Sequence, residues 1–293
     1  MKLFEGIALE QNVFKDNLSL EEINSYIDTI SQEGLVDDAI EKIKSIFASL
    51  GSMFKQYTIE GTAENDLIIQ NELKKINESL AVLKSYPNPE RLPALVDSKA
   101  NVLIAVPNGF KGELADYMDK LLIVSTKLQN ITMSEIEKYN AILANIISNE
   151  NARKSHNNLH QNYTNVSNNV NKAKDIQHSY FNYSGSNHGL LKLGKLVDSF
   201  RELVSLEDKS IKLANSIKFK DIMLVNTGIT KTTELLNVII SDVNSSYSTS
   251  LIKELAVYTK EIASMCEAYS IARYYNELCI VMSRNCICTV AEG

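Results

Sequence analysis

The chain has 293 residues, no tryptophan and a net charge of −6 at pH 7, with 44% hydrophobic and 23% charged residues. This composition is that of an ordinary globular protein, and the length allows one large domain or two modest ones. A nucleic-acid-binding face needs clustered Lys and Arg, and the sequence shows no such cluster. Nucleic acid is therefore not expected as the main partner.

Neither a membrane span nor a secretory signal is indicated. No apolar run approaches the roughly 18 residues that a membrane helix needs. The segment from Met1 to Asn17 contains Glu5, Glu10 and Asp16, and it lacks the basic start and apolar core of a secretory signal. We therefore expect a protein that is neither secreted nor transmembrane.

The prolines divide the chain. All of them lie between Pro87 and Pro107, so the long stretches on either side are free of proline. Proline costs about 3 kcal/mol inside a helix, and the apolar residues of both stretches recur at helical spacing. The sequence predicts an all-α protein, an irregular multi-helix bundle of about eight to ten helices. We expect an N-terminal helical region over 1–86, a connector with proline and glycine over 87–112, and a C-terminal helical bundle over 113–293.

Three helices are predicted before the prolines. Ser19 and Glu22 form a capping box that begins the first helix, and Gly34 can end it. The second helix ends at Gly61, and its apolar stripe consists of Ile40, Ile43, Phe47, Leu50 and Phe54. The third helix runs from about Glu64 to Ser85, and its inward residues are Leu73, Ile76, Leu80 and Leu83.

The connector begins with a firm break at 86–89, because residues before proline avoid the helical region. The apolar run from Val102 to Val106 is consistent with a short strand or with the buried end of a helix. A single strand without a partner is unfavourable, so we favour the helix. Pro107, Asn108 and Gly109 predict a turn. Whether the connector is a hinge or a rigid corner stays open.

The sequence after the connector predicts several further helices. The first covers about 113–129, and the second begins at a capping box of Thr132 and Glu135 and runs to about 149. Between 149 and 187 asparagine is abundant, yet an apolar stripe predicts an exposed, polar helix that ends in a loop over 183–189. That stripe consists of Leu159, Tyr163, Val166 and Val170.

Three more helices are predicted before the C-terminal one. One covers about 187–204, and the next begins at Ser205, which forms a weaker box with Asp208. Thr227 and Gly228 are expected to end that helix and to begin another, which ends near Val243.

The last predicted helix has the clearest pattern in the chain. Its apolar positions alternate strictly in steps of four and three over about four heptads. They are Leu251, Leu255, Tyr258, Ile262, Met265, Tyr269, Ala272, Asn276 and Cys279. This stripe fits an intermolecular coiled coil, with Asn276 as the residue that sets the register. The flanking positions lack the Glu/Lys pairs that choose a partner, so we favour packing within the chain's own bundle.

Two segments come close to nucleotide-binding motifs without matching them. The segment 189–196 nearly fits a phosphate-binding loop, but Leu196 stands where a serine or threonine must hold magnesium. The segment 221–232 lacks the first glycine and the glycine–lysine pair of such a loop. We therefore expect no cofactor.

The histidines and cysteines show no metal-binding pattern. His156 and His160 lie four residues apart, but no cysteine is near them and we expect both on an exposed face. Cys266 and Cys279 are expected as small apolar core residues, whereas Cys286 and Cys288 are expected near an exposed tail. Whether Cys279, Cys286 and Cys288 meet in a site stays open. We assign no catalytic, cofactor-binding or metal-ligating residue.

The chain is rich in Asn and Ser, and its predicted helices are long and carry no enzymatic motif. In this style the chain resembles uncharacterised helical virion proteins of large tailed bacteriophages. The stretch from Val106 to Leu114, with Tyr117 and Leu121-Leu122, is similar to this class. Leu3-Phe4-Glu5 resembles a site of the prohead proteases of such phages, and the triplet recurs at 20–22. Whether the N-terminus is processed stays open.

Three hypotheses about function follow. The resemblance implies a non-enzymatic structural or interaction protein, such as a head or internal component of a phage particle. Its partners would be proteins, either itself or other particle components, and apolar Leu3, Phe4 and Ile7 could dock on a neighbour. The alternative is a soluble helical adaptor or effector with a single protein partner. An enzyme with a site built from distant residues is the third, and a small-molecule ligand is not expected. The location would be the virion or the cytoplasm of the host cell.

Overall fold

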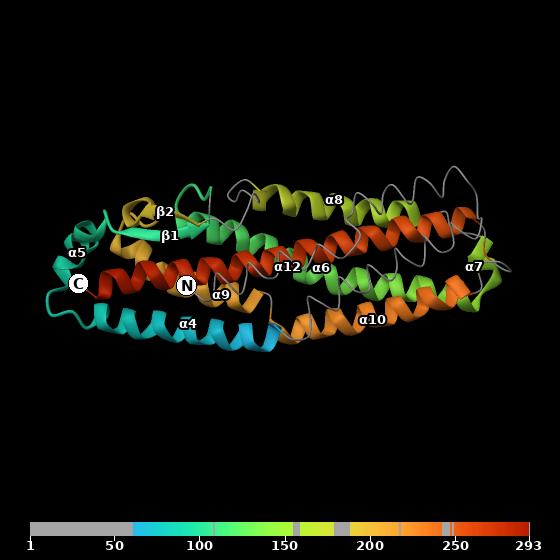
Figure 1. Ribbon diagram of the computed structural model, residues 1–293, viewed down its shortest axis with the longest axis horizontal. Coiled ribbons are helices and arrows are strands. Elements are labelled where there is room, and N and C mark those ends of the chain that lie inside the picture. Colours follow the sequence, from blue (N-terminus) through green and yellow to red (C-terminus); the bar gives the residue numbers. More distant parts are fainter. Residues whose placement is uncertain are drawn as a thin grey trace. The chain divides into compact units, whose positions relative to one another are not determined.

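The computed structural model describes residues 61–107, 109–154, 159–178, 188–216, 218–241, 247 and 249–292. These residues form long helices and one two-stranded sheet, so the predicted all-α fold with a long C-terminal helix is confirmed (Figure 1). The two helices expected before Gly61 lie outside the described residues.

The chain divides into two compact units that interleave along the sequence. The first contains residues 1–61, 128–172 and 220–270, and the second contains 62–127, 173–219 and 271–293. Residues 86 and 112, where the sequence predicts regional boundaries, both fall within the second unit. The long helices α6 (Leu114–Ser148) and α12 (Thr249–Ala291) are each divided between the two units, and so is α8 (Leu159–His178).

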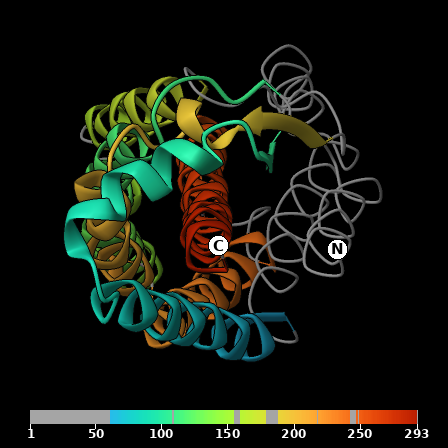
Figure 2. The ribbon, with the colours of Figure 1, turned by 90° about the vertical axis from the view of Figure 1, so that its left-hand side faces the viewer.

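The second unit surrounds the C-terminal part of α12. Figure 2 shows this part of the helix between α4 (Gly61–Lys84) and the two strands β1 and β2. The break at 86–89 is confirmed, because a short 3-10 helix, η2 (Pro89–Arg91), follows it and leads into α5 (Leu92–Lys99). In α4 the predicted inward residues Ile76, Leu80 and Leu83 are buried, whereas Leu73 is half-buried.

The connector contains a strand rather than the end of a helix. Strand β1 (Leu103–Pro107) pairs with β2 (His188–Lys192) in antiparallel fashion, with Leu103 opposite Lys192. The helix predicted over 102–106 is therefore wrong, because the strand has a partner far away in the sequence. The helix predicted over 187–204 is wrong in its first part for the same reason, since His188–Lys192 forms β2, whereas residues 200–204 are helical; Gly189 lies in β2 rather than in a loop. The turn after β1 is confirmed, since the Phe110 N–H donates to the Pro107 carbonyl at 3.1 Å and Gly109 has a φ of 83°.

Two capping boxes predicted by the sequence lie inside helices. Helix α6 is continuous over 35 residues, and Thr132 is fully buried in its middle. Ser205 and Asp208 lie inside α9 (Phe200–Ser216), which follows the 3-10 helix η3 (Leu193–Lys195). The cap of α9 is Ser199, whose Oγ accepts from the Glu202 N–H at 3.2 Å, while Glu202 Oε2 accepts from the Asp198 N–H at 2.7 Å.

The first unit contains the rest of α6 and α12 with three further elements. They are α7 (Glu150–Lys154), most of α8 (Leu159–His178) and α10 (Phe219–Ser241). In α8 the predicted apolar residues Leu159, Val166 and Val170 are buried. The break predicted at Gly228 is wrong, because α10 passes through it. A Cβ at Gly228 would lie 2.6 Å from Ile136 Cγ2, so glycine is required here by the close approach to α6.

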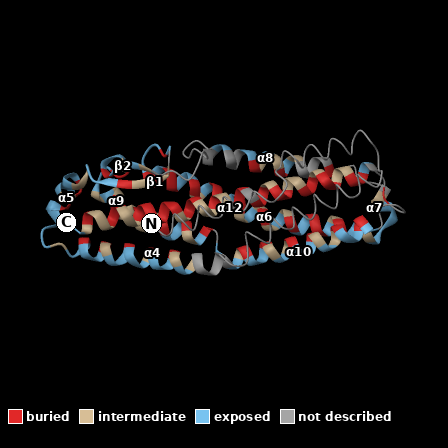
Figure 3. Cartoon of the chain, viewed as in Figure 1, coloured by how far each residue is buried: buried red, intermediate tan, exposed pale blue. Residues whose placement is uncertain are grey.

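The apolar residues of helix α12 are buried, whereas its charged residues, among them Lys260 and Arg284, are half-buried. All nine heptad positions predicted from the sequence are buried, and so are residues on the other faces, among them Ile252, Ile280 and Ile287. Figure 3 shows α12 in the buried colour along most of its length, whereas α4 and α10 present exposed faces. Burial of an apolar stripe by neighbouring helices of the same chain is the packing of a bundle interior. The heptad stripe therefore packs within the chain's own bundle, as predicted.

Candidate functional site

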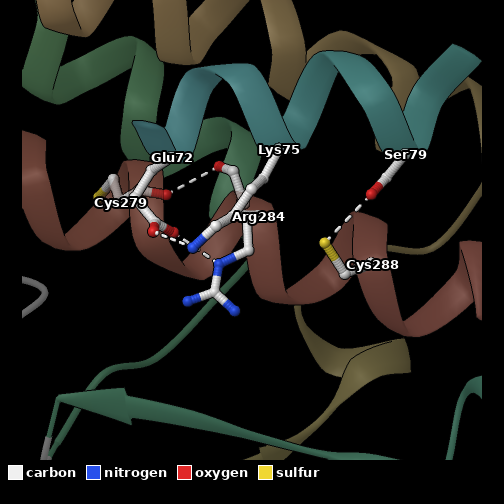
Figure 4. Close-up of polar contacts among 7 residues, drawn as sticks. Glu72, Lys75, Ser79, Cys279, Arg284 and Cys288 are labelled. Atoms are coloured by element: carbon white, nitrogen blue, oxygen red, sulfur yellow. Dashed lines mark hydrogen bonds and ion pairs between the residues drawn. The ribbon is translucent and has the colours of Figure 1, made fainter. Parts of the chain in front are cut away.

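A cluster of charged side chains joins α4 to α12 in the second unit. Glu72 on α4 is only 6% exposed. Its Oε2 accepts from the Arg284 Nε of α12 at 2.6 Å, and its Oε1 accepts from the Lys75 Nζ at 2.9 Å (Figure 4). Burying a carboxylate is costly unless it is paired and hydrogen-bonded, and here both oxygens have a cationic donor. The cluster therefore fixes α4 against α12.

The ionisation of Glu72 follows from these contacts. Burial of the carboxyl by itself raises the pKa of Glu72, because it disfavours the charged form. The hydrogen bonds and positive charges of Lys75 and Arg284 outweigh the burial, and the resulting pKa lies below the ordinary value. Glu72 is therefore an ionised partner in a fixed contact, and not an acid held ready to release a proton at neutral pH.

A pH dependence of stability follows from the lowered pKa. A carboxyl whose folded pKa is depressed stabilises the fold above its unfolded value of 4.5, and that contribution is lost as the pH falls through the folded value. Solvent screens part of the contribution, because the Arg284 and Lys75 side chains are 30% and 54% exposed. We expect Glu72→Gln to lower the free energy of unfolding by about 1–2 kcal/mol at pH 7 and by almost nothing well below pH 4.5.

Chemical denaturation at several pH values measures this effect. The matched control is Glu78→Gln, because the Glu78 side chain on the same helix is 63% exposed and lies 3.8 Å from Lys74. The control is expected to change stability by less than about 0.5 kcal/mol at every pH. Identical pH profiles for the two variants would contradict the assignment of Glu72 as the ionised partner.

Three of the four cysteines are buried core residues. Cys266, Cys279 and Cys286 are buried, so the prediction of an exposed Cys286 is wrong. Burial raises the pKa of the Cys286 thiol to about 12, which keeps the thiol protonated and unreactive. Cys288 is half-buried, and its Sγ lies 3.2 Å from Ser79 Oγ in a hydrogen bond in which either atom can donate. Within the described ranges no group of His, Cys, Asp and Glu could hold a metal ion.

A second polar cluster, entirely buried, surrounds Asn276 on α12. Asn276 Oδ1 accepts from Ser125 Oγ of α6 at 3.0 Å. Its Nδ2 donates to Ser216 Oγ at 2.9 Å and to the Leu213 carbonyl at 3.2 Å, both on α9. The amide therefore joins three helices of one unit. It is a polar residue in the heptad stripe, as the sequence indicates, but its partners belong to the same chain.

Polar contacts of the same kind join the helices of the first unit. Tyr139 Oη of α6 lies 2.7 Å from Thr259 Oγ1 of α12 and donates to the Leu255 carbonyl at 3.1 Å. Burial raises the pKa of Tyr139 far above its ordinary value, so the phenol stays neutral. Asn140 Nδ2 donates to the Gly228 carbonyl at 2.9 Å, and Thr232 Oγ1 donates to Asn140 Oδ1 at 2.8 Å. These side chains hold helices together and leave no reactive group exposed among them.

The remaining candidates from the sequence fall in separate places. The segment 189–196 forms β2 and η3, and Leu193 and Leu196 are buried, so its amides do not form a phosphate cradle. His156 lies outside the described residues, and His160 is in α8. The cluster at Glu72 could not be found from the sequence, because its two helices are 212 residues apart along the chain.

The exposed apolar side chains of the two-stranded sheet form a second kind of candidate. We call the pair of strands β1 and β2 the ribbon. Leu103 and Leu190 are 55% and 61% exposed on it, whereas Ile104 and Val106 of the other face are buried. In an antiparallel sheet with one face in solvent, the outer positions usually hold charged or hydroxyl residues. The outer face of the ribbon therefore carries one exposed leucine on each of its two strands.

Comparisons with known proteins add no relative. No protein-family model, no curated protein and no solved structure matches this chain. Among the described helices, none combines the length and the apolar character needed to cross a membrane.

Proposed function

We propose that this chain is a non-enzymatic structural or interaction protein, and that it serves as a component of a phage particle. The observation that supports the proposal is the use of polar groups around α12. Asn276, Thr259 and Arg284 each bond to a neighbouring helix, so the polar side chains of the central helix serve to hold the bundle. An enzyme keeps such groups in a cleft, with ionisation shifted toward its chemistry.

The resemblance in style to helical virion proteins supports the finer part of the proposal. Within each compact unit the helices pack closely around a buried part of α12, and such close packing makes a stiff body that suits a part of a larger assembly. A second candidate function is an adaptor with a single protein partner. It is favoured by the exposed Leu103 and Leu190 of the ribbon, since exposed apolar side chains on one face are a feature of interaction sites.

Sedimentation of a native lysate from the source tests the proposal. An antibody against the chain would be used to locate it across a density gradient at low and at high salt. We expect the chain to sediment with a large particle and to stay with it at high salt, because built-in components are held by extensive apolar contacts. Migration near its own mass of 32.8 kDa, or as a small oligomer, would overturn the particle role and leave the adaptor as the better function.

A further inference from the structure

The two faces of the ribbon differ in what they offer to other molecules. In an antiparallel pair, residues that lie opposite each other share a face. Leu103 lies opposite Lys192 and Ala105 lies opposite Leu190, so these four side chains share the outer face. Ile104 and Val106 on the inner face are 4% and 2% exposed, while Leu103 and Leu190 are more than half exposed. The outer face therefore presents two leucines beside one lysine.

Some backbone N–H and C=O groups of the ribbon point away from the partner strand. The Leu193 N–H donates to the Val102 carbonyl at 2.8 Å, so these two opposite residues form a hydrogen-bonded pair. Bonded and non-bonded pairs alternate along an antiparallel ladder, which makes Ile104 and Leu191 bonded as well. The N–H and C=O groups of Leu190 and Lys192 then point away from β1. No third strand pairs with the ribbon in the part of the chain that the structure describes.

The two edges of the ribbon are not equivalent. The edge of β1 ends in Pro107, which has no N–H, and the Pro107 carbonyl already accepts from Phe110. The edge of β2 carries Leu190 and Lys192, each with an N–H and a C=O, and both side chains are exposed. An unpaired edge with these groups is a template for another strand. The β2 edge is therefore the better of the two for an added strand.

We propose that the β2 edge binds an extended segment of a partner protein by strand addition, with an apolar residue beside Leu190 and an acidic residue beside Lys192. In such complexes the backbone hydrogen bonds supply affinity and alternate side chains supply specificity. The charge of the partner segment follows from Lys192, whose ammonium has a neutral partner among the described residues, Asn101 Oδ1 at 2.9 Å. The partner's two key residues are separated by one position, because alternate residues share a face.

A second copy of the chain fits this site less well. A stable interface needs about 800 Å² from each partner. Two leucines and an alanine beside one lysine supply far less, and the lysines of two copies would repel each other. An extended segment does not need that area, because its backbone bonds along the β2 edge. The proposal rests on the interaction role stated above and names the surface that would carry it.

Binding of short labelled peptides to the full-length protein tests the proposal. The probe is a fluorescein-labelled peptide of alternating valine and threonine, with one valine replaced by glutamate. A second probe carries lysine at that position. A third probe has the sequence of the first, but its backbone is N-methylated at the residues whose N–H groups would bond to β2. We expect the glutamate peptide to bind about fivefold more tightly than the lysine peptide, and the N-methylated peptide not to bind.

Variants of the edge make the test specific. We expect Lys192→Glu to reverse the preference, so that the lysine peptide binds more tightly than the glutamate peptide. Its control is Lys195→Glu, which changes an exposed lysine outside the strands. We expect Leu190→Ser to weaken binding of the glutamate peptide several-fold, while Leu67→Ser, at a leucine 63% exposed on α4, leaves it unchanged.

Amide hydrogen exchange locates the bound strand. Added peptide is expected to slow exchange at Leu190 and Lys192 and to leave Leu191, which already bonds to β1, unaffected. Equal effects of the edge variants and their controls would overturn the proposal, as would protection that grows with protein concentration without peptide. If Lys192→Glu fails to alter peptide binding while the chain still sediments with a particle, the strand-addition site is wrong and the proposed function stands.

Discussion

Replacement of Asn276 by leucine is expected to lower the free energy of unfolding by about 3 kcal/mol. The substitution removes one acceptor and two donor contacts inside the second unit, where Ser125, Ser216 and Asn276 are all buried. A buried hydroxyl left without its partner retains the cost of its lost hydration. Urea denaturation followed by circular dichroism measures the loss.

Two further variants control for this result. Asn237→Leu changes an exposed asparagine on α10 and is expected to alter stability by less than about 0.5 kcal/mol. In a background of Ser125→Ala and Ser216→Ala, the cost of Asn276→Leu is expected to shrink, because the partners are no longer left unsatisfied. If Asn276→Leu instead stabilised the protein and changed its oligomeric state, Asn276 would be a register residue between chains.

Replacement of Gly228 by valine is the second large change, with an expected loss of about 3 kcal/mol. In an exposed helix, replacing glycine removes a propensity penalty of up to about 1 kcal/mol. At Gly228 the added Cβ meets Ile136 Cγ2 at 2.6 Å, and the Gly228 carbonyl is held by Asn140. Ile136 is buried in α6 and β-branched, so it has little freedom to move away. Thermal and urea unfolding measure the effect.

The contact with Ile136 makes a specific rescue possible. Ile136→Ala removes Cγ2, so the two substitutions together are expected to cost clearly less than the sum of their separate costs. Thr230→Val serves as the control, because Thr230 is exposed on the same helix and valine has nearly its shape. Strict additivity of Gly228→Val and Ile136→Ala would show that the close approach of α10 to α6 does not cause the loss.

The elements that the sequence predicts correctly are those with a long local pattern. The heptad stripe of α12 and the stripe of α8 depend only on residues a few positions apart. The ribbon was missed because β1 and β2 meet across about 80 residues, and each strand alone is as short as a helix end. Alternation of the β-branched Ile104 and Val106 with other residues was the local signal in favour of a strand.

The errors at Gly228 and Thr132 share one feature. Residues that usually mark a helix end, such as Gly228 and Thr132, occupy places where two helices pack closely. Glycine and threonine are small, and a close approach of two backbones selects small residues as strongly as a helix end does. The charged cluster could not be predicted from the sequence, because Glu72 and Arg284 are far apart along the chain and share no local pattern.

The position of α12 in the chain has a consequence for biosynthesis. Every other described element precedes α12, yet this helix forms the interior of both units. A nascent chain therefore leaves the ribosome with the apolar faces of α4, α6, α9 and α10 still uncovered, and neither interior can close until translation of α12 is complete. Closure of both interiors therefore waits for the synthesis of α12, and a chain stalled before Thr249 would expose apolar helix faces that chaperones and proteases recognise.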